Sequence, residues 1–249
     1  TGGIDLSVGS IFALLGIIMS IMLCQWQVPW PLVVLAILII SACLGLSHGM
    51  LITKLNIQPF IVTLCGLLIY RGLARYIAQD QTQGFGYCKG FHTLQDLTTG
   101  KIFGIPMPFI FLLIIAAIMF LLLHKSVYGR YLYAVGKNEQ AARFSGINTR
   151  LIIISAYIIA SLSAGFAAIL LAFYTNSISP SSHGSFYELY AIAAAVLGGC
   201  SLKGGEGSVI GIIIGTALLQ VLQNLVNLLG IPSSLNFAVM GTVILMGVT

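Results

Sequence analysis

Residues 124–147 read HKSVYGRYLYAVGKNEQAARFSGI, and long apolar runs lie on both sides of this stretch. The segment from Lys125 to Arg150 holds five of the eleven Lys and Arg residues of the chain and only one acid. Basic residues are retained on the cytoplasmic side when a membrane protein inserts. The segment is therefore predicted to be a cytoplasmic loop between two membrane-spanning helices, and it sets the orientation of the other spans.

A short helix signal lies inside this loop. Asn138 can accept from the backbone N–H groups that follow it, and Glu139 complements the positive end of a helix. Gly146 suits the left-handed residue that ends a helix. A capped helix between two spans has two interpretations, a docking element for another protein and a solvated loop with one helical turn. The local signals leave both open.

The composition predicts an all-α polytopic membrane protein. Of the 249 residues, 58% are hydrophobic and only 7% are charged, and the mean hydropathy is +1.04. A soluble domain carries roughly a quarter charged residues, so this chain has too little charge to cover a water-facing surface. We expect one transmembrane domain over residues 1–249. The net charge of +5 falls mainly in loops between spans, which argues for membrane orientation and against nucleic-acid binding.

Apolar runs of roughly 20 residues can cross the hydrocarbon as helices, because lipid cannot satisfy open backbone polar groups. The sequence contains about eight such runs. The sixth is short and ends at Gly198-Gly199, so a broken or re-entrant segment is the alternative there. The predicted spans are Leu6–Cys24, Pro31–Leu51, Ile57–Ile77, Met107–His124, Leu151–Phe173, Phe186–Leu202, Ser208–Leu229 and Ser234–Val248.

Two stretches indicate an internal pseudo-repeat. Residues 2–9 read GGIDLSVG and precede the first span, while residues 204–211 read GGEGSVIG and precede the seventh. Each has paired glycines, an acid, and Ser-Val two residues after the acid. Glycine-interrupted segments mark corresponding halves of many transporters, although chance similarity of glycine-rich sequence is the competing explanation.

Asp5 and Ser7 are candidates for a translocation path at the start of the first span. For Asp5 the favoured interpretation is a helix cap that accepts from the N–H of Ser7 or Val8. The alternative is a carboxylate, or an open helix end, that faces a polar substrate. Glu206 allows the same two interpretations, with the cap favoured more strongly.

The seventh span carries four side-chain amides at helical spacing i, i+3, i+4 and i+7. Amides both donate and accept hydrogen bonds, as sugar hydroxyls require. In lipid such a face must turn towards another helix or a water-filled path, so interhelical bonding and a pathway lining both fit. The four residues are Gln220, Gln223, Asn224 and Asn227.

Three charged residues are predicted at the outer end of the spans. Arg71 and Arg75 lie one turn apart in the third span, where reaching towards the outer headgroups is the default role. Contact with an external partner is the alternative. Glu188 can pair with either arginine or contact the same partner.

Catalytic and metal-binding motifs are missing from the sequence. It has no G-x-x-x-x-G-K-[ST] phosphate loop, no H-E-x-x-H, no serine nucleophile elbow and no C-x-x-C pair. We therefore expect a chain that is not an enzyme and that holds no metal.

The assembled motifs resemble the membrane permease subunit of bacterial ATP-binding-cassette (ABC) importers for ribose and other simple sugars, within the sugar and branched-chain amino acid permease superfamily. They run almost end to end along the chain in the expected order, and the motif in the basic loop is the most specific. The resemblance is carried by residues 2–10 (GGIDLSVGS), 59–64 (PFIVTL) with Arg71-Gly72, 128–130 (YGR), 134–147 (AVGKNEQAARFSGI), 187–189 (YEL), 191–199 (AIAAAVLGG) and 224–230 (NLVNLLG).

The resemblance implies the ABC importer permease fold, with this chain holding the last eight of about ten spans of about 20 residues each. It implies a second permease subunit, in a homodimer or heterodimer, in the bacterial inner membrane. A cytoplasmic ATPase would bind ATP and Mg, so that no cofactor is expected in this chain, and a periplasmic sugar-binding protein would lie outside, on the side of Arg71, Arg75 and Glu188. The loop at residues 78–106 shows little of the family pattern.

On the same resemblance, residues 138–147 would be the coupling helix that seats in a groove of the ATPase. Small side chains would permit close approach and charged ones would contact the rim of the groove. The residues assigned to coupling are Asn138, Glu139, Ala141, Ala142, Arg143 and Gly146.

The main alternative function is an ion-coupled secondary transporter of a small polar solute. Proton coupling uses carboxylates or histidines inside the membrane, and the span interiors contain none that stand out. Sodium coupling is harder to exclude from composition. A membrane-embedded enzyme and a passive channel are weaker alternatives. Dependence of uptake on ATP or on an ion gradient separates the first two classes.

Overall fold

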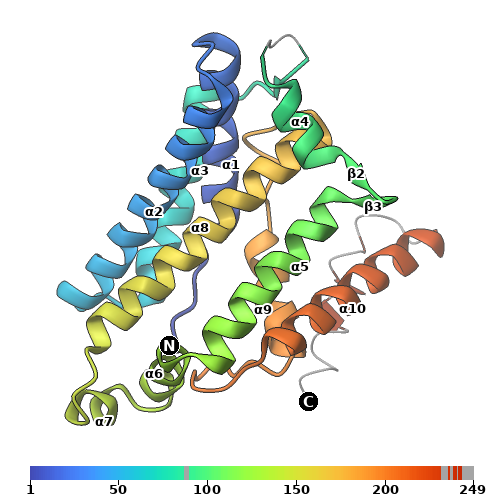
Figure 1. Ribbon diagram of the computed structural model, residues 1–249. Helices are drawn as coiled ribbons and strands as arrows, with labels where there is room; N and C mark the ends of the chain where they lie inside the picture. Colours follow the sequence, from blue (N-terminus) through green and yellow to red (C-terminus); the bar gives the residue numbers. More distant parts are fainter. Residues whose placement is uncertain (87–89, 231–234, 236–237, 240, 243–249) are drawn as a thin grey trace. The chain divides into compact units, whose positions relative to one another are not determined.

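The computed structural model describes residues 1–86, 90–230, 235, 238, 239, 241 and 242. These residues form mainly helices (Figure 1), with two short antiparallel ladders. In one ladder β1 (Gln83–Gly84) pairs with β4 (Ser177–Ile178), and in the other β2 (Lys101–Ile102) pairs with β3 (Ile105–Pro106). The helices are α1 (Val8–Ser20), α2 (Trp30–Lys54), α3 (Pro59–Ala78), α4 (His92–Thr99), α5 (Met107–Phe120), α6 (Val127–Lys137), α7 (Glu139–Phe144), α8 (Thr149–Thr175), α9 (Tyr187–Leu197) and α10 (Val209–Leu228).

Six helices in the described part of the chain are long and apolar enough to cross a membrane. Two of them include a π-helical turn, Ile21–Gln25 after α1 and Leu121–Lys125 after α5. The six confirm an all-α polytopic class, and they match six of the predicted spans to within a few residues. They are Val8–Gln25, Trp30–Lys54, Pro59–Ala78, Met107–Lys125, Thr149–Thr175 and Val209–Leu228.

The helix α9 is shorter than the sixth predicted span, Phe186–Leu202. It has 11 residues, which is a length of roughly 16 Å at the α-helical rise and about half of the hydrocarbon thickness. It ends where Gly199 adopts a left-handed conformation with φ of +85°. The prediction of a full span is wrong here, and the short segment considered as the alternative is present. The eighth predicted span, Ser234–Val248, lies largely outside the described residues.

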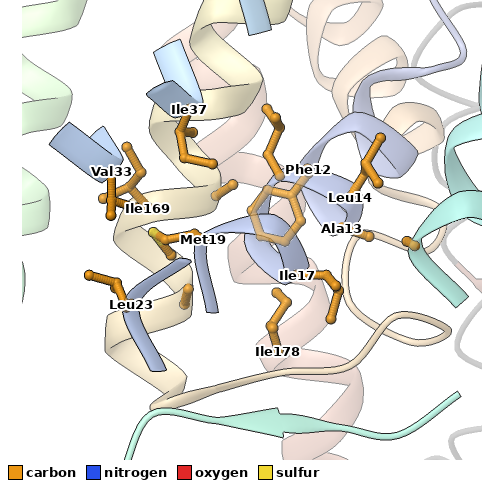
Figure 2. Close-up of a cluster of buried hydrophobic side chains, with 14 of the residues drawn as sticks. Phe12, Ala13, Leu14, Ile17, Met19, Leu23, Val33, Ile37, Ile169 and Ile178 are labelled. Carbon is orange, nitrogen blue, oxygen red and sulfur yellow. The ribbon is translucent and has the colours of Figure 1, made fainter. Parts of the chain in front are cut away.

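One compact unit comprises residues 4–117 and 148–188, and α1 is its central helix. Eleven of the 13 residues of α1 are buried, and the helix contacts α2, α3 and α8. Figure 2 shows its apolar side chains in this core, where Phe12 and Met19 lie among Val33, Ile37 and Ile169 from α2 and α8. A helix that is apolar on all sides and buried on all sides fits the interior of a membrane bundle.

Close backbone packing joins α2 to α8 within this unit. A Cβ on Gly45 would lie 2.5 Å from the carbonyl oxygen of Tyr157, and one on Gly49 would lie 2.7 Å from the Cα of Ile154. Nearby, the Ser41 hydroxyl donates to the Ser161 carbonyl. Small residues that let helix backbones approach are the usual basis of helix association in lipid.

The second compact unit comprises residues 1–3, 118–147 and 189–249. Its described helices are α6, α7, α10 and most of α9. A small apolar cluster joins α9 to α10 through Ala193, Ala194 and Leu219. Most of the remaining side chains of α10 are exposed in the single chain.

Candidate functional site

The basic loop contains the predicted capped helix, α7, with both of its caps. Asn138 is extended, and its Oδ1 accepts from the backbone N–H of Ala141 at 2.9 Å. At the other end Gly146 has φ of +84°. Its N–H donates to the Arg143 carbonyl at 3.1 Å, and the N–H of Ile147 donates to the Ala142 carbonyl at 3.1 Å. These bonds satisfy the backbone groups that a helix leaves open at its ends, which makes six residues sufficient for a defined helix.

The surface of α7 is mostly open. Glu139, Ala141 and Arg143 are exposed, whereas Ala142 is only 5% exposed. Ala142 is therefore covered by its own chain and does not present its methyl group to a partner, which changes the interpretation given to it from the sequence. The remaining coupling candidates, Asn138 and Gly146, are exposed and act through the helix caps.

Phe144 is the surface residue of α7 that sequence reasoning missed. Its side chain is 93% exposed at the end of a polar helix. An isolated exposed aromatic ring is common on protein surfaces, but aromatic anchors are enriched where partners bind. The available signal was a phenylalanine inside a capped, otherwise polar turn.

The helix α6, which lies inside the predicted loop, connects α7 to the start of α10. Ser126 caps α6 through its Oγ, which accepts from the N–H of Gly129 at 3.1 Å. Further along, the Tyr133 hydroxyl donates to the Gly207 carbonyl at 2.7 Å. Just before α6, Nε2 of His124 accepts from the N–H of Val209 at 3.3 Å. Two side chains around α6 thus hold the residues on both sides of Ser208, where α10 begins.

The four amides of α10 lie on its open side. Gln220, Asn224 and Asn227 are exposed and Gln223 is half-buried, whereas Leu219 and Val226 are buried. Exposed amides on a membrane helix cannot face hydrocarbon without cost. The arrangement favours a polar surface, from water or from protein, along this side of α10.

Asp5 and Ser7 meet at the start of α1, and Asp5 acts there as a local acceptor. Its Oδ1 accepts from the backbone N–H of Ser7 at 2.8 Å and from the Ser7 hydroxyl at 2.6 Å. Ser7 is fully buried and its carbonyl accepts from Ser10 Oγ at 2.7 Å. The expected bond from the N–H of Ser7 is present, but Ser7 is itself the N-cap residue of α1, so Asp5 closes a turn before the helix and caps none of its N–H groups. The other oxygen, Oδ2, is buried and has no hydrogen-bond partner among the described residues. These two residues and the amides of α10 belong to different compact units.

Arg71 turns towards its own chain. Its Nη1 donates to the carbonyls of Pro180 at 3.0 Å and His183 at 2.7 Å, and its Nη2 donates to the Gly9 carbonyl at 3.4 Å. The expectation that Arg71 extends to the outer headgroups is therefore wrong. Glu188 is buried at 8% exposure, and its Oε2 lies where a Cβ on Gly9 would be. Arg71 and Glu188 both adjoin Gly9.

Arg75 is separate from that group and exposed. It forms an ion pair with Asp80, with 2.6 Å between Nε and Oδ1 and 3.0 Å between Nη2 and Oδ2. The hydrogen bond from the guanidinium holds the pKa of the Asp80 carboxyl below its ordinary value. Both residues line an open surface hollow of about 660 Å³ together with Gly72, Tyr76 and Gln79. Among the described residues no group of three His, Cys, Asp or Glu side chains is placed to hold a metal ion.

Long apolar helices, an amide face on α10 and a capped helix in a basic segment define a multi-pass membrane protein with the features of a transport subunit. Comparison with known proteins gives the family. The model of the family described as "Branched-chain amino acid transport system / permease component" matches residues 1–248, and the chain belongs to this family.

Similar proteins include several sugar permeases. The ribose import permease protein RbsC of Bacillus subtilis (strain 168) is 41% identical over 252 residues, covering 100% of this chain and 76% of that protein. RbsC of Escherichia coli (strain K12) is 37% identical over 248 residues, covering 100% and 77%. The D-allose transport system permease protein AlsC of the same strain is 32% identical over 246 residues, covering 99% and 74%. No solved structure matches the chain.

Proposed function

We propose that this chain is the transmembrane subunit of an ATP-driven importer in the bacterial inner membrane, where it forms the translocation path for a simple sugar of the ribose class. The observation that carries the proposal is α7, a capped and exposed helix in the most basic segment of a chain related to ribose permeases. A second permease subunit completes the path. Uptake is driven by a separate ATPase that binds ATP and Mg, and this chain carries out no reaction itself.

The contact with the ATPase is proposed to use the exposed side of α7. Phe144 supplies an apolar anchor, while Glu139 and Arg143 supply charge at the rim. A short helix whose ends are capped within its own chain needs no partner in order to fold, so little ordering is required when it docks. Asn138 and Gly146 contribute by keeping that shape.

The path for the sugar is proposed to run along the amide face of α10. Gln220, Gln223, Asn224 and Asn227 offer donors and acceptors that hydroxyl groups can use in turn. Their exposure in the single chain is what a water-filled path requires. Asp5 and Ser7 bond each other and contribute the start of α1. The buried Oδ2 of Asp5 has no hydrogen-bond partner among the described residues and is proposed to accept from a water or a solute hydroxyl.

A periplasmic sugar-binding protein is proposed to contact the outer end of α3. Arg75 and Asp80 are exposed there beside the hollow described above. Arg71 and Glu188 contribute indirectly, because Arg71 holds the loop around Pro180 and His183 in place.

The proposal is tested by reconstitution of the purified chain in proteoliposomes with the candidate ATPase and sugar-binding protein of the same organism. Uptake of radiolabelled D-ribose should require ATP inside the vesicles and should persist when an ionophore removes ion gradients. Uptake that needs no nucleotide and collapses with the ionophore would instead establish the ion-coupled alternative.

The docking surface is tested by Phe144→Asp, with Phe103→Asp as the matched control. Both rings are almost fully exposed, but Phe103 lies in the turn between β2 and β3. Loss of an aromatic anchor typically weakens an interface by about tenfold or more, so Phe144→Asp should abolish co-purification of the ATPase and Phe103→Asp should not. Equal retention of the ATPase by both variants would rule out this surface.

A further inference from the structure

Three backbone segments that are distant in sequence meet at glycines in the unit that contains α7. They are the segment at Gly2, the end of α6 at Gly136, and the loop at Gly204 and Gly205. A Cβ on Gly204 would lie 2.6 Å from the nitrogen of Gly2 and 2.9 Å from the carbonyl oxygen of Gly136. A Cβ on Gly136 would overlap the nitrogen of Gly205. The contacts are backbone against backbone, so no side chain can rotate to make room.

Left-handed backbone accompanies this contact. Gly2, Gly204 and Gly205 have φ of +76°, +89° and +76°, a conformation that residues with a Cβ rarely adopt. The position of the loop is thus set by conformation as well as by contact. We call Gly2, Gly136, Gly204 and Gly205 the glycine junction.

Hydrogen bonds extend the junction on the side of α10. The Tyr133 hydroxyl, one turn before Gly136, donates a hydrogen bond of 2.7 Å to the carbonyl of Gly207. The Val209 N–H at the start of α10 donates a hydrogen bond of 3.3 Å to His124 Nε2. The same C-terminal end of α6 that holds Gly136 is separated from α7 only by Asn138, which caps α7. A continuous series of short contacts therefore joins α7 to the first turn of α10.

We propose that the glycine junction and Tyr133 transmit movement of α7 to α10, and so couple the docked ATPase to the amide face. This rests on the proposed function of α7. Packed backbones are stiff and have no side chains that can absorb a displacement, so a shift of α6 must move the loop at residues 204–207 and the helix that follows. Gln220 lies about 12 residues into that helix, which is roughly 18 Å from its start at the α-helical rise. A tilt of α10 about its first turn therefore displaces the amide side chains.

The segments of the pseudo-repeat meet in the same place. Gly2 belongs to the stretch that leads to α1, and Gly204 belongs to the stretch that leads to α10, and their backbones are in contact. The junction thus holds both lead-in segments at the end of α6. Gly2, Gly136, Gly204, Gly205 and Tyr133 are positioning residues that act through α10 and contact no sugar.

The test uses two variants and two matched controls in the full importer. Tyr133→Phe removes only the hydroxyl, and Tyr131→Phe is its control on the same helix. Gly136→Ala introduces the overlapping Cβ, and Gly86→Ala is its control, because a Cβ there has nothing within 4 Å. Three quantities are measured: ATPase co-purification, uptake of radiolabelled D-ribose, and ribose transported per ATP hydrolysed.

We expect both test variants to retain the ATPase and to lose coupling, with ribose transported per ATP falling about fivefold for Tyr133→Phe, the effect of one hydrogen bond. For Gly136→Ala the fall should be larger. The controls should match the wild type. A loss of stability alone would lower the amount of importer and leave this ratio unchanged. If Tyr133→Phe transports as much ribose per ATP as the wild type, the proposal is overturned. This outcome decides the matter even if Gly136→Ala fails to insert.

A measurement on the permease alone separates this proposal from the proposed function. Hydrogen exchange is followed in nanodiscs without any ATPase. In Tyr133→Phe the amides of residues 204–210 should exchange about fivefold faster than in Tyr131→Phe, while α8 is unchanged. Unchanged hydrogen exchange would refute the proposed transmission through the glycine junction and Tyr133 even if uptake is ATP-driven. Faster exchange in a protein whose uptake is independent of ATP would support the connection between α6 and α10 and would refute the proposed function as an ATP-driven importer.

Discussion

The helices α1 and α10 follow similar segments but have different surroundings. Before α1, Asp5 bonds Ser7, and the helix is then buried for nearly its whole length. Before α10, Glu206 is exposed, Ser208 caps the helix, and most side chains of the helix remain open. The repeated pattern therefore specifies a glycine lead-in and a helix start, whereas burial depends on which helices pack against each copy.

Each of these helix starts is in contact with a glycine beside α9. A Cβ on Gly9 would overlap the carbonyl oxygen of Gly184, which precedes α9, and one on Gly211 would overlap the carbonyl oxygen of Gly198, which follows it. Each contact lies within its own compact unit. The same packing device at both starts supports the pseudo-repeat over chance similarity.

The largest difference between the starts of α1 and α10 is expected in the stability lost when the acid before each helix, Asp5 or Glu206, is replaced. Asp5→Ala removes the acceptor of two hydrogen bonds and leaves the buried Ser7 donors unsatisfied, which should lower the free energy of unfolding by about 2–3 kcal/mol. Glu206→Ala removes an exposed side chain and should change it by less than about 0.5 kcal/mol. Unfolding titrations with SDS in mixed micelles measure both. Equal effects would mean that the two acids have the same role despite their surroundings.

A second difference concerns the polar face, which α10 has and α1 lacks. Replacing Asn224 and Asn227 together with Leu should reduce D-ribose uptake by about tenfold or more, because the path loses groups that replace water around a polar solute. ATPase co-purification and the amount of inserted protein should not change, since both residues are exposed.

The matched control for the amide variant keeps the same helix and changes its apolar exposed side. Val221→Ile with Leu225→Ile should leave uptake as in the wild type. Full uptake in the amide variant would assign Asn224 and Asn227 to packing against another protein surface.

Much of the fold was predictable from the sequence because the spans are continuous apolar runs. The run Met107–His124, for example, is found as Met107–Lys125. The caps of α7 were predictable for a similar reason, because Asn138 and Gly146 act on neighbours a few residues away. Signals of this kind depend on local chemistry and not on the partner helices.

The missed features depend on contacts that are remote in sequence. Arg71 bonds carbonyls more than 100 residues away, and no local pattern distinguishes this from an arginine that reaches lipid headgroups. The helix α6 has two charged residues and two glycines among its 11 residues, so it lacks the continuous apolar pattern that marks the spans. Phe144 and Ala142 show the same limit, since neighbouring residues in one turn differ in exposure from 93% to 5%.

A smaller effect is expected from the cap of α10. Ser208 Oγ accepts from the N–H of Gly211 at 3.4 Å, while Ser7 makes no such bond at the start of α1. Ser208→Ala should cost about 0.5–1 kcal/mol of stability, and Ser208→Gly only a few tenths. The SDS titration measures this order, and a larger cost for glycine than for alanine would show that Ser208 is not acting as a cap.

The smallest expected effect is a pH dependence that arises from His183, near the start of α1. Nδ1 of His183 accepts from the N–H of Ser179 at 2.8 Å, and the His183 carbonyl accepts from Arg71 beside Gly9. Burial lowers the pKa of His183 below its ordinary value. The unfolded chain therefore binds this proton more readily, so the stabilisation is present above the unfolded pKa of about 6.5 and is lost as the pH falls below it.

Protonation of His183 also removes the acceptor at Nδ1 and places a positive charge near the Arg71 guanidinium, so the loop around Pro180 should loosen. The apparent Tm should fall slightly between pH 7.5 and 5.5, by about 2 °C or less. His183→Asn keeps an acceptor but does not titrate, so the fall should be smaller in this variant. An identical fall in both proteins would place the pH sensitivity elsewhere and leave the two helix starts alike in this respect.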